Sequence, residues 1–179
     1  FSNGNTTVTT PSVGYSGAIG SMGASSGKYY FEFKPISKTG DNDEYSVGIA
    51  AQSVHSINQP HWKMSLGYMY TGVNGNKINN DTSSSYGNTF TAGDIIGVCV
   101  DRSNSRIWFS KNNVWQNGGN PNDPTDSNAA FTNVTSTGTL IPFYGNNNST
   151  AGYGSANFGQ KPFKYAPPAG FQPLNAANV

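Results

Sequence analysis

No window of a dozen residues in this sequence keeps apolar side chains at helical spacing without a Gly, Pro or Asn interruption. An amphipathic helix needs apolar residues at i, i+3, i+4 and i+7, because one face must pack on the core. Short β-rich runs separated by turn-forming residues occupy most of the chain instead. The pattern predicts an all-β protein, and a length of 179 residues favours a single domain spanning residues 1–179.

The clearest predicted strands alternate apolar and small or polar residues. Residues 45–50 place Tyr45, Val47 and Ile49 on one face. Residues 93–101 and 105–110 are two β-rich runs around a polar turn, which is typical of an antiparallel pair. The other predicted strands are 29–33, 66–70, 114–116, 140–144 and 155–158.

Alternation within these strands assigns individual side chains to faces. Phe109 is predicted in the core, so the adjacent Trp108 points to the outer side, beneath the C-terminal segment. Gly48 and Gly97 stand inside strands, where a missing side chain permits a bend or a close approach of the facing sheet. Pro142 cannot donate a ladder hydrogen bond, which predicts an edge strand or a bulge.

Charge and cysteine content exclude several classes of protein. The chain has 10 Lys+Arg and 9 Asp+Glu, a net charge of +1, and lacks the clustered cations that nucleic-acid binding needs. The longest apolar run, residues 95–100, is far too short to cross a bilayer. Cys99 is the single cysteine, which excludes an internal disulfide and a cysteine metal cluster, and its apolar neighbours predict burial.

Long polar segments separate the predicted strands. Loops longer than about twelve residues are uncommon in compact domains and usually functional or mobile. These segments are therefore the first place to look for a binding surface. They are residues 51–65, 79–91, 117–139 and 146–154.

The ordered set of motifs resembles the SPRY domain family over about residues 26–174. The resemblance implies a bent sandwich of two antiparallel sheets, a concanavalin-A-like jelly roll, that acts as a binding module rather than an enzyme. Around it, residues 1–25 are expected to form an N-terminal strand and lead-in, and residues 160–179 a Pro-rich C-terminal wrap. The motifs that carry the resemblance are residues 26–33, 46–50, 93–97 leading to 109–112, 140–143 and 156–165.

The opening motifs, residues 2–5 and 17–20, are similar to SPRY modules of bacteriophage virion proteins and bacterial surface proteins. This resemblance implies a virion location, on a tail, fibre or capsid surface. The expected function is non-catalytic attachment to a host surface glycan or protein. The alternatives are a purely structural contact with a neighbouring virion protein and a lectin-like glycan-binding module. A homo-oligomer is compatible with each of these roles.

In the SPRY family, loops at one end of the sandwich usually grip short peptides or protein surfaces. Trp and Tyr are favoured at such sites because they add large contact area at small entropic cost. Loops rich in Asn, Ser, Thr and Gly also suit sugars, whose hydroxyls need donors and acceptors. Carried over by position, the resemblance predicts the ligand-binding residues His61, Trp62, Tyr86, Trp115, Asn146 and Tyr153.

The sequence gives little support for a metal site, and no cofactor is expected. His55 and His61 share one loop without a third ligand nearby. Residues 41–44 carry carboxylates, as do Asp123 and Asp126, but the spacing of a twelve-residue calcium loop is missing. Solvated turns are the favoured interpretation of these carboxylates, and calcium is the alternative.

Catalysis is not expected either. A glycosidase needs two carboxylates across the scissile bond, and the only glutamates, Glu32 and Glu44, lie on different segments. Neither a Gly-x-Ser-x-Gly motif nor a phosphate-binding loop occurs. The prediction is therefore a chain with no catalytic residues.

Overall fold

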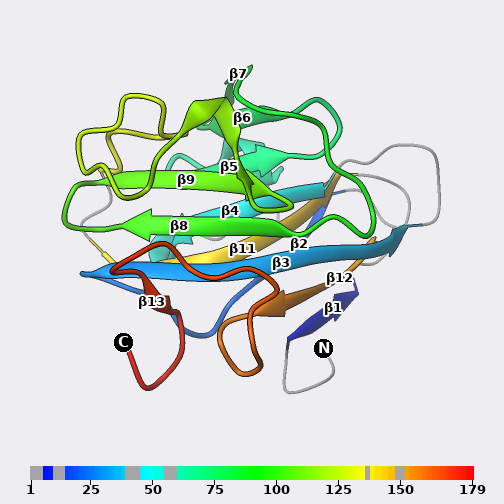
Figure 1. Ribbon diagram of the computed structural model, residues 1–179. Helices are drawn as coiled ribbons and strands as arrows, with labels where there is room; N and C mark the ends of the chain where they lie inside the picture. Colours follow the sequence, from blue (N-terminus) through cyan, green and yellow to red (C-terminus); the bar gives the residue numbers. More distant parts are fainter. Residues whose placement is uncertain (1–5, 10–14, 39–44, 55–59, 136–137, 148–151) are drawn as a thin grey trace.

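Two sheets packed face to face form a bent sandwich in the computed structural model, which describes residues 6–9, 15–38, 45–54, 60–135, 138–147 and 152–179 (Figure 1). The prediction of an all-β sandwich is confirmed. Helical structure in these ranges is limited to three single turns, η1 (Gln52–Val54), η2 (His61–Lys63) and η3 (Gln116–Gly118). No helix of the described residues has the length and apolar character needed to span a bilayer.

Sheet A has the strand order β1-β12-β3-β8-β9-β10, and β13 pairs in parallel with one end of β3. All its other pairs are antiparallel. Its strands are β1 (Thr7–Thr9), β3 (Lys28–Lys38), β8 (Ile96–Asp101), β9 (Arg106–Lys111), β10 (Val114–Trp115), β12 (Gly152–Asn157) and β13 (Gln172–Pro173).

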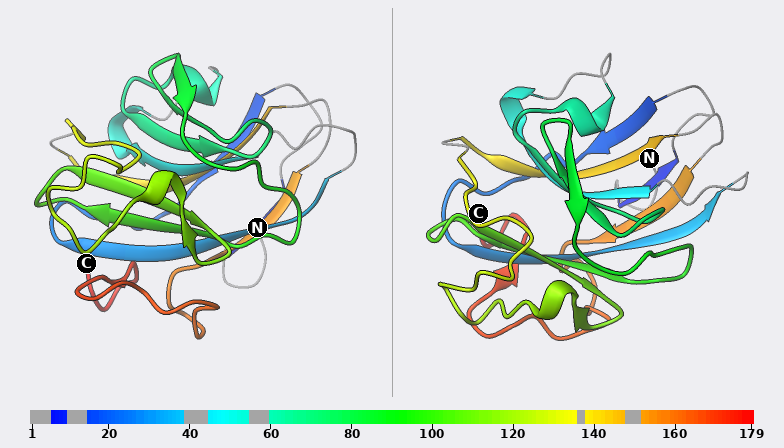
Figure 2. Two further views of the ribbon diagram at one scale, coloured as in Figure 1. Left: turned by 45° about the horizontal axis from the view of Figure 1, so that its top comes forward. Right: turned by 90° about the horizontal axis from the view of Figure 1, so that it is seen from above.

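Sheet B has the order β2-β11-β4-β5-β6-β7 and is antiparallel throughout. Figure 2 shows the two layers from further directions, with the C-terminal segment on the outer side of sheet A. The strands of sheet B are β2 (Tyr15–Ile19), β4 (Tyr45–Ala51), β5 (Gly67–Thr71), β6 (Asn76–Asn79), β7 (Thr82–Ser85) and β11 (Leu140–Asn147).

The main core lies between the sheets and contains the residues that alternation assigned to it. Phe109 of sheet A stacks on Tyr70 of sheet B, with ring centroids 5.5 Å apart. Phe33 of sheet A also stacks on Tyr144 of sheet B, with ring centroids 4.6 Å apart. The core members from β4, β8 and β9 are Tyr45, Val47, Ile49, Ala51, Ile96, Val98, Val100, Ile107 and Phe109.

A second apolar cluster covers the outer face of sheet A, and Trp108 lies at its centre, fully buried. Its indole Nε1 donates a hydrogen bond of 2.7 Å to Asp126 Oδ2. Phe171 from the C-terminal segment packs edge-on against the indole, and Cys99 is buried in the same cluster. The predicted outward direction of Trp108 and the burial of Cys99 are both confirmed.

The C-terminal segment is tied to this face through Glu32. Its carboxylate is 4% exposed and accepts hydrogen bonds from the backbone N–H of Lys164 at 2.9 Å and of Tyr165 at 2.8 Å. A buried carboxylate is stable only when such donors surround it. A buried carboxylate therefore anchors the C-terminal segment to the outer face of sheet A.

A smaller apolar cluster of Ala50, Met64, Met69 and Phe143 covers the outer face of sheet B. On this face a Cβ at Gly48 would lie 2.0 Å from the carbonyl oxygen of Tyr68 on the neighbouring strand β5, so the missing side chain serves packing within sheet B and not an approach of the facing sheet. The matching glycine of sheet A, Gly97, leaves room for the hydroxyl groups of Ser110 and Tyr30.

Three local predictions are wrong. Residues 82–85 form the edge strand β7 rather than a loop, and β11 and β12 extend into the predicted loop 146–154. Pro142 lies in an interior strand without a bulge, since β11 pairs with both β2 and β4. The carbonyl of Pro142 accepts a hydrogen bond from the N–H of Gly20, the residue that follows the end of β2. The nitrogen of Pro142 faces the same side, where β2 has already ended. The absence of an N–H on Pro142 therefore breaks no pairing between the strands.

Candidate functional site

The six predicted ligand-binding residues separate into two groups. Four of them belong to η2 and to the strands β11 and β12: His61, Trp62, Asn146 and Tyr153. Tyr86 and Trp115 lie beside β7 and β10, the edge strands on one side of the two sheets. The structure therefore does not bring the six residues together into the single surface that the sequence predicted.

His61 is buried and holds η2 against sheet B. The chain leaves β4 at Ala51 and returns in η2, so that His61 Nε2 and Ser46 Oγ share a hydrogen bond of 3.0 Å near the start of β4. The absence of a side chain at Gly145 makes room for the imidazole, because a Cβ there would lie 2.9 Å from His61 Cγ. Phe143 packs on the same ring with centroids 5.7 Å apart.

His61 is only 6% exposed, and burial lowers its pKa to about 4. Its Nδ1 has no hydrogen-bond partner among the described residues. The imidazole is consequently neutral at physiological pH and is held below the surface. The prediction of His61 as a ligand contact is wrong, because the imidazole packs into the outer face of sheet B.

Trp62 is half-buried and stands edge-on to His61, with ring centroids 5.1 Å apart. The N–H of Asp81 donates to its carbonyl at 2.8 Å, which fixes η2 against the β6–β7 hairpin. Trp62 therefore presents a partly exposed indole on a fixed base. Large aromatic groups held in this way supply contact area without further loss of side-chain freedom on binding.

Asn146 and Tyr153 lie in strands rather than in the η2 segment that carries Trp62. Asn146 is 3% exposed and is paired across the ladder with Tyr45, a core residue, so its side chain lies on the inner face. The prediction of a loop-borne contact at Asn146 is wrong because β11 continues through it. Tyr153 is half-buried on β12, in the opposite sheet, where it pairs with Thr9 and Ser37.

The second group flanks a polar groove between the two sheet edges, with about 830 Å³ of empty space open to solvent. Tyr86 is buried in the main core, where its hydroxyl accepts a hydrogen bond from Phe109 N. Only Trp115 of this group remains half-exposed. Tyr86 follows β7 in a loop, as predicted, but the prediction of a ligand contact is wrong because its side chain packs into the core.

Gln116, which the sequence analysis did not single out, shapes this groove. Its Oε1 accepts from Asn88 N at 2.8 Å, and its Nε2 donates to the carbonyl of Val114 at 2.7 Å. The side chain thereby joins the segment after β7 to β10. No local pattern marks Gln116, because Asn88 is distant in sequence.

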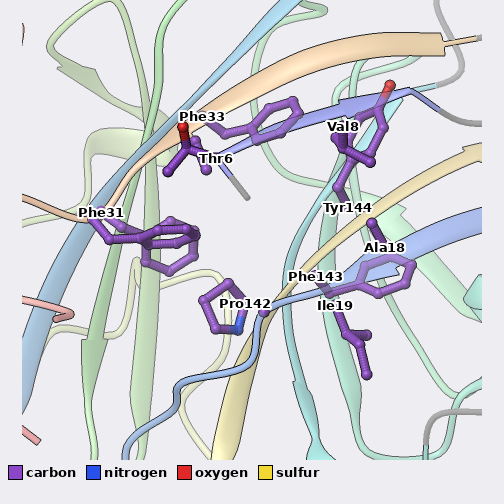
Figure 3. A pocket seen from close by; sticks show the side chains of 12 residues that line it. Thr6, Val8, Ala18, Ile19, Phe31, Phe33, Pro142, Phe143 and Tyr144 are labelled. Atoms are coloured by element: carbon purple, nitrogen blue, oxygen red, sulfur yellow. The ribbon is translucent and has the colours of Figure 1, made fainter. Parts of the chain in front are cut away.

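A second hollow lies between the edge strands β1 and β2 on the other side of the sandwich (Figure 3). About 410 Å³ of empty space is bordered there mainly by apolar side chains, including the stacked rings of Phe33 and Tyr144. A hollow of this chemistry can receive an aliphatic side chain. None of the six predicted residues lines it.

Among the described residues, no cluster of His, Cys, Asp and Glu side chains could hold a metal ion. Asp126 is buried and accepts hydrogen bonds from Trp108 Nε1 and from the backbone N–H of Asn120 and Asn128. The predicted solvated turn is thus wrong for Asp126, which has a structural task. Asp123 caps a local turn through Thr125, while residues 41–44 and His55 lie outside the described residues.

The SPRY domain profile matches residues 28–161 of this chain. The chain belongs to the SPRY family. The crystal structure of the SPRY domain of human HERC1 superposes with a TM-score of 0.67 at 24% identity and covers 88% of this chain and 91% of that domain. This likeness shows the shared fold.

Sequence relatives come from animals and plants. The chain is 37% identical over 145 residues to the Drosophila melanogaster "Ran-binding proteins 9/10 homolog", covering 79% of this chain and 13% of that protein. It is 40% identical over 90 residues to Danio rerio "Ran-binding protein 9", or 50% of this chain and 15% of the relative. It is 34% identical over 111 residues to the Arabidopsis thaliana "E3 ubiquitin-protein ligase RKP", a match that covers 62% of this chain and 8% of that protein.

These relatives correct the predicted source and location. They are eukaryotic proteins, so the bacteriophage type, the virion location and the role in host attachment are wrong. The N-terminal motifs that suggested a phage protein are rich in Gly and small polar residues. Part of them, residues 17–19, is simply the end of β2 against β11. Such composition suits strand ends and turns in any sandwich and does not mark a source.

Proposed function

We propose that this chain is a non-catalytic protein-interaction domain that binds an extended segment of a partner protein beside Trp62. The observation that carries the proposal is the half-buried indole of Trp62 on the base formed by His61, Ser46 and Gly145. Membership of the SPRY family supports it, as do the relatives named for binding Ran. The match covers a small part of those relatives, so Ran is one probe among others.

The chemistry of the described residues supports the non-catalytic part of the proposal. Glu32 is saturated by backbone donors. Ser46 and His61 form a buried pair, and no described Asp or Glu is hydrogen-bonded to His61 Nδ1. A nucleophile of the serine-histidine kind needs an exposed hydroxyl and an oriented base. Neither condition is met at this pair.

The test uses the purified chain to select peptides from a displayed random library, with purified Ran as a second probe. Selected peptides are synthesised with a fluorescent label and titrated by polarisation. Trp62→Ala should weaken binding at least about tenfold, because truncating a central aromatic contact commonly costs about 2 kcal/mol. Trp115→Ala, on the other edge of the sandwich, is the matched control and should bind as the wild type does.

Three outcomes decide the matter. Loss of binding in Trp62→Ala alone supports the proposal. Loss in Trp115→Ala alone moves the site to the polar groove and overturns the proposed location. No selected peptide and no Ran binding above background would overturn the function itself. Circular dichroism and thermal melting of both variants check that each one is folded.

A further inference from the structure

Three of the ten cationic residues surround one hollow on the outer face of sheet A. Lys34 projects from β3, while Lys161 and Lys164 come from the segment after β12. The hollow holds about 660 Å³ of empty space between these two elements. It lies on the opposite sheet from Trp62, so it is independent of the site proposed above.

Unlike Lys28 and Lys111, these three lysines have no carboxylate partner among the described residues. All three are exposed, and within the described ranges no ion pair involves them. Elsewhere, Lys28 pairs with Asp101 and Lys111 pairs with Asp94, each at 3.2 Å. The positive charge around this hollow is therefore left for a partner molecule to neutralise.

Among the described residues of the lining, Glu32 is the one acid, and its oxygens are already engaged. They accept from Tyr30 Oη at 3.2 Å and from the backbone N–H of Lys164 and Tyr165. Its negative charge offsets part of the field of the three lysines and leaves a net charge of about +2 around the hollow. This excess suits a ligand with few negative charges rather than a polyanion.

The segment that carries Lys161 and Lys164 is fixed in place before any ligand arrives. Asn157 Nδ2 donates to the carbonyl of Pro162 at 3.1 Å. Gln160 Nε2 donates to the carbonyl of Ala156 at 3.1 Å. Phe163 stands edge-on to Tyr30 with centroids 4.9 Å apart. A fixed backbone lowers the entropic cost of binding.

We propose that this hollow binds an acidic peptide segment, with two or more Asp or Glu side chains beside one aliphatic residue. The lysines on both sides would meet the carboxylates, and Ile95 with Phe163 would contact the aliphatic group. Charge complementarity of this kind fixes orientation and speeds association. A nucleic acid fits less well, because its affinity comes from neutralising a long row of phosphates.

The test is a fluorescence polarisation titration of the full chain with a labelled acidic peptide, in which Asp and Glu flank one Leu. Each of Lys34→Gln, Lys161→Gln and Lys164→Gln should weaken binding about two- to fivefold, the size expected for an exposed ion pair. The triple variant should lose at least about tenfold. Lys63→Gln makes the same charge change on η2, on the opposite sheet, and should bind as the wild type does.

Three comparison probes are titrated in parallel: the same peptide with Asn and Gln for its acids, a short single-stranded DNA, and phosphatidylserine vesicles. Binding of the acidic peptide should fall with added salt, because screening shortens the reach of exposed charges. Equal binding of the amide peptide, tighter binding of DNA or vesicles, or an unaffected triple variant would each overturn the proposal. Folding of each variant is checked by thermal melting.

Discussion

The two outer faces of the sandwich are covered in different ways. On sheet A, a long C-terminal segment and the loop after η3 bury Trp108 and Cys99, and two buried carboxylates, Glu32 and Asp126, hold them in place. On sheet B, the single turn η2 covers a smaller cluster and is held by the neutral pair of His61 and Ser46. The cover of sheet A therefore depends on charged anchors, whereas the cover of sheet B depends on close packing and a neutral histidine.

The largest expected effect tests close packing. Gly48→Ala should destabilise the fold by at least about 3 kcal/mol, because the new methyl group would meet the backbone oxygen of Tyr68, which cannot move alone. Gly97→Ala, on sheet A, should cost about 1 kcal/mol, since the groups it meets are side-chain hydroxyls of Ser110 and Tyr30. Urea denaturation measures both, and equal costs would contradict the comparison.

The next effect tests the charged anchor of sheet A. Asp126→Ala should destabilise the fold by about 3 kcal/mol, because the indole N–H of Trp108 and the N–H groups of Asn120 and Asn128 lose their acceptor. Asp123→Ala removes a neighbouring carboxylate that serves only a local turn. Its effect on the urea midpoint should be much smaller. An equal shift in both variants would refute the role of Asp126 as an anchor.

The smallest effect tests the neutral histidine of sheet B. Burial lowers the pKa of His61 from 6.5 to about 4, so the unfolded chain takes up the proton first as the pH falls. The stability contributed by this group is therefore full above about pH 6.5 and is lost toward pH 4. Between pH 7 and pH 5 the loss should be about 2 kcal/mol, a value that follows from these two pKa values.

His61→Gln is the matched variant for this pH dependence. It should be less stable at pH 7 and should show a shallower fall in unfolding free energy between pH 7 and pH 5. Denaturant titrations at several pH values give the two slopes. Identical slopes in the wild type and the variant would assign the pH dependence to other groups.

The sequence predicted the strands that bury side chains and much less of what lies between them. Alternation along β9 assigned Phe109 to the inner face and Trp108 to the outer face. Both assignments are confirmed, because β9 is buried on both faces, Phe109 in the main core and Trp108 in the outer cluster. It missed β7, whose residues 82–85 are exposed Ser and Thr without an apolar face. Hydrophobic periodicity gives no signal for such a strand.

The candidate site was harder to predict because burial of polar groups is decided by distant partners. Asn146 and Tyr86 have the composition of loop residues, yet strand continuation buries the first and core packing buries the second. Asp126 and Gln116 have structural roles that depend on Trp108 and Asn88, respectively. A single sequence shows which residues could form hydrogen bonds and not which partners the fold supplies.

The position of Cys99 allows its thiol to report when the cover of sheet A opens. The thiol is buried beneath the cover of sheet A, and burial raises its pKa. It is therefore protected from reagents that react with the thiolate. A coloured disulfide reagent can modify it only after the C-terminal segment lifts away or the domain unfolds. A modification rate above the rate of global unfolding thus measures how often the cover of sheet A opens, and the measurement needs no added label.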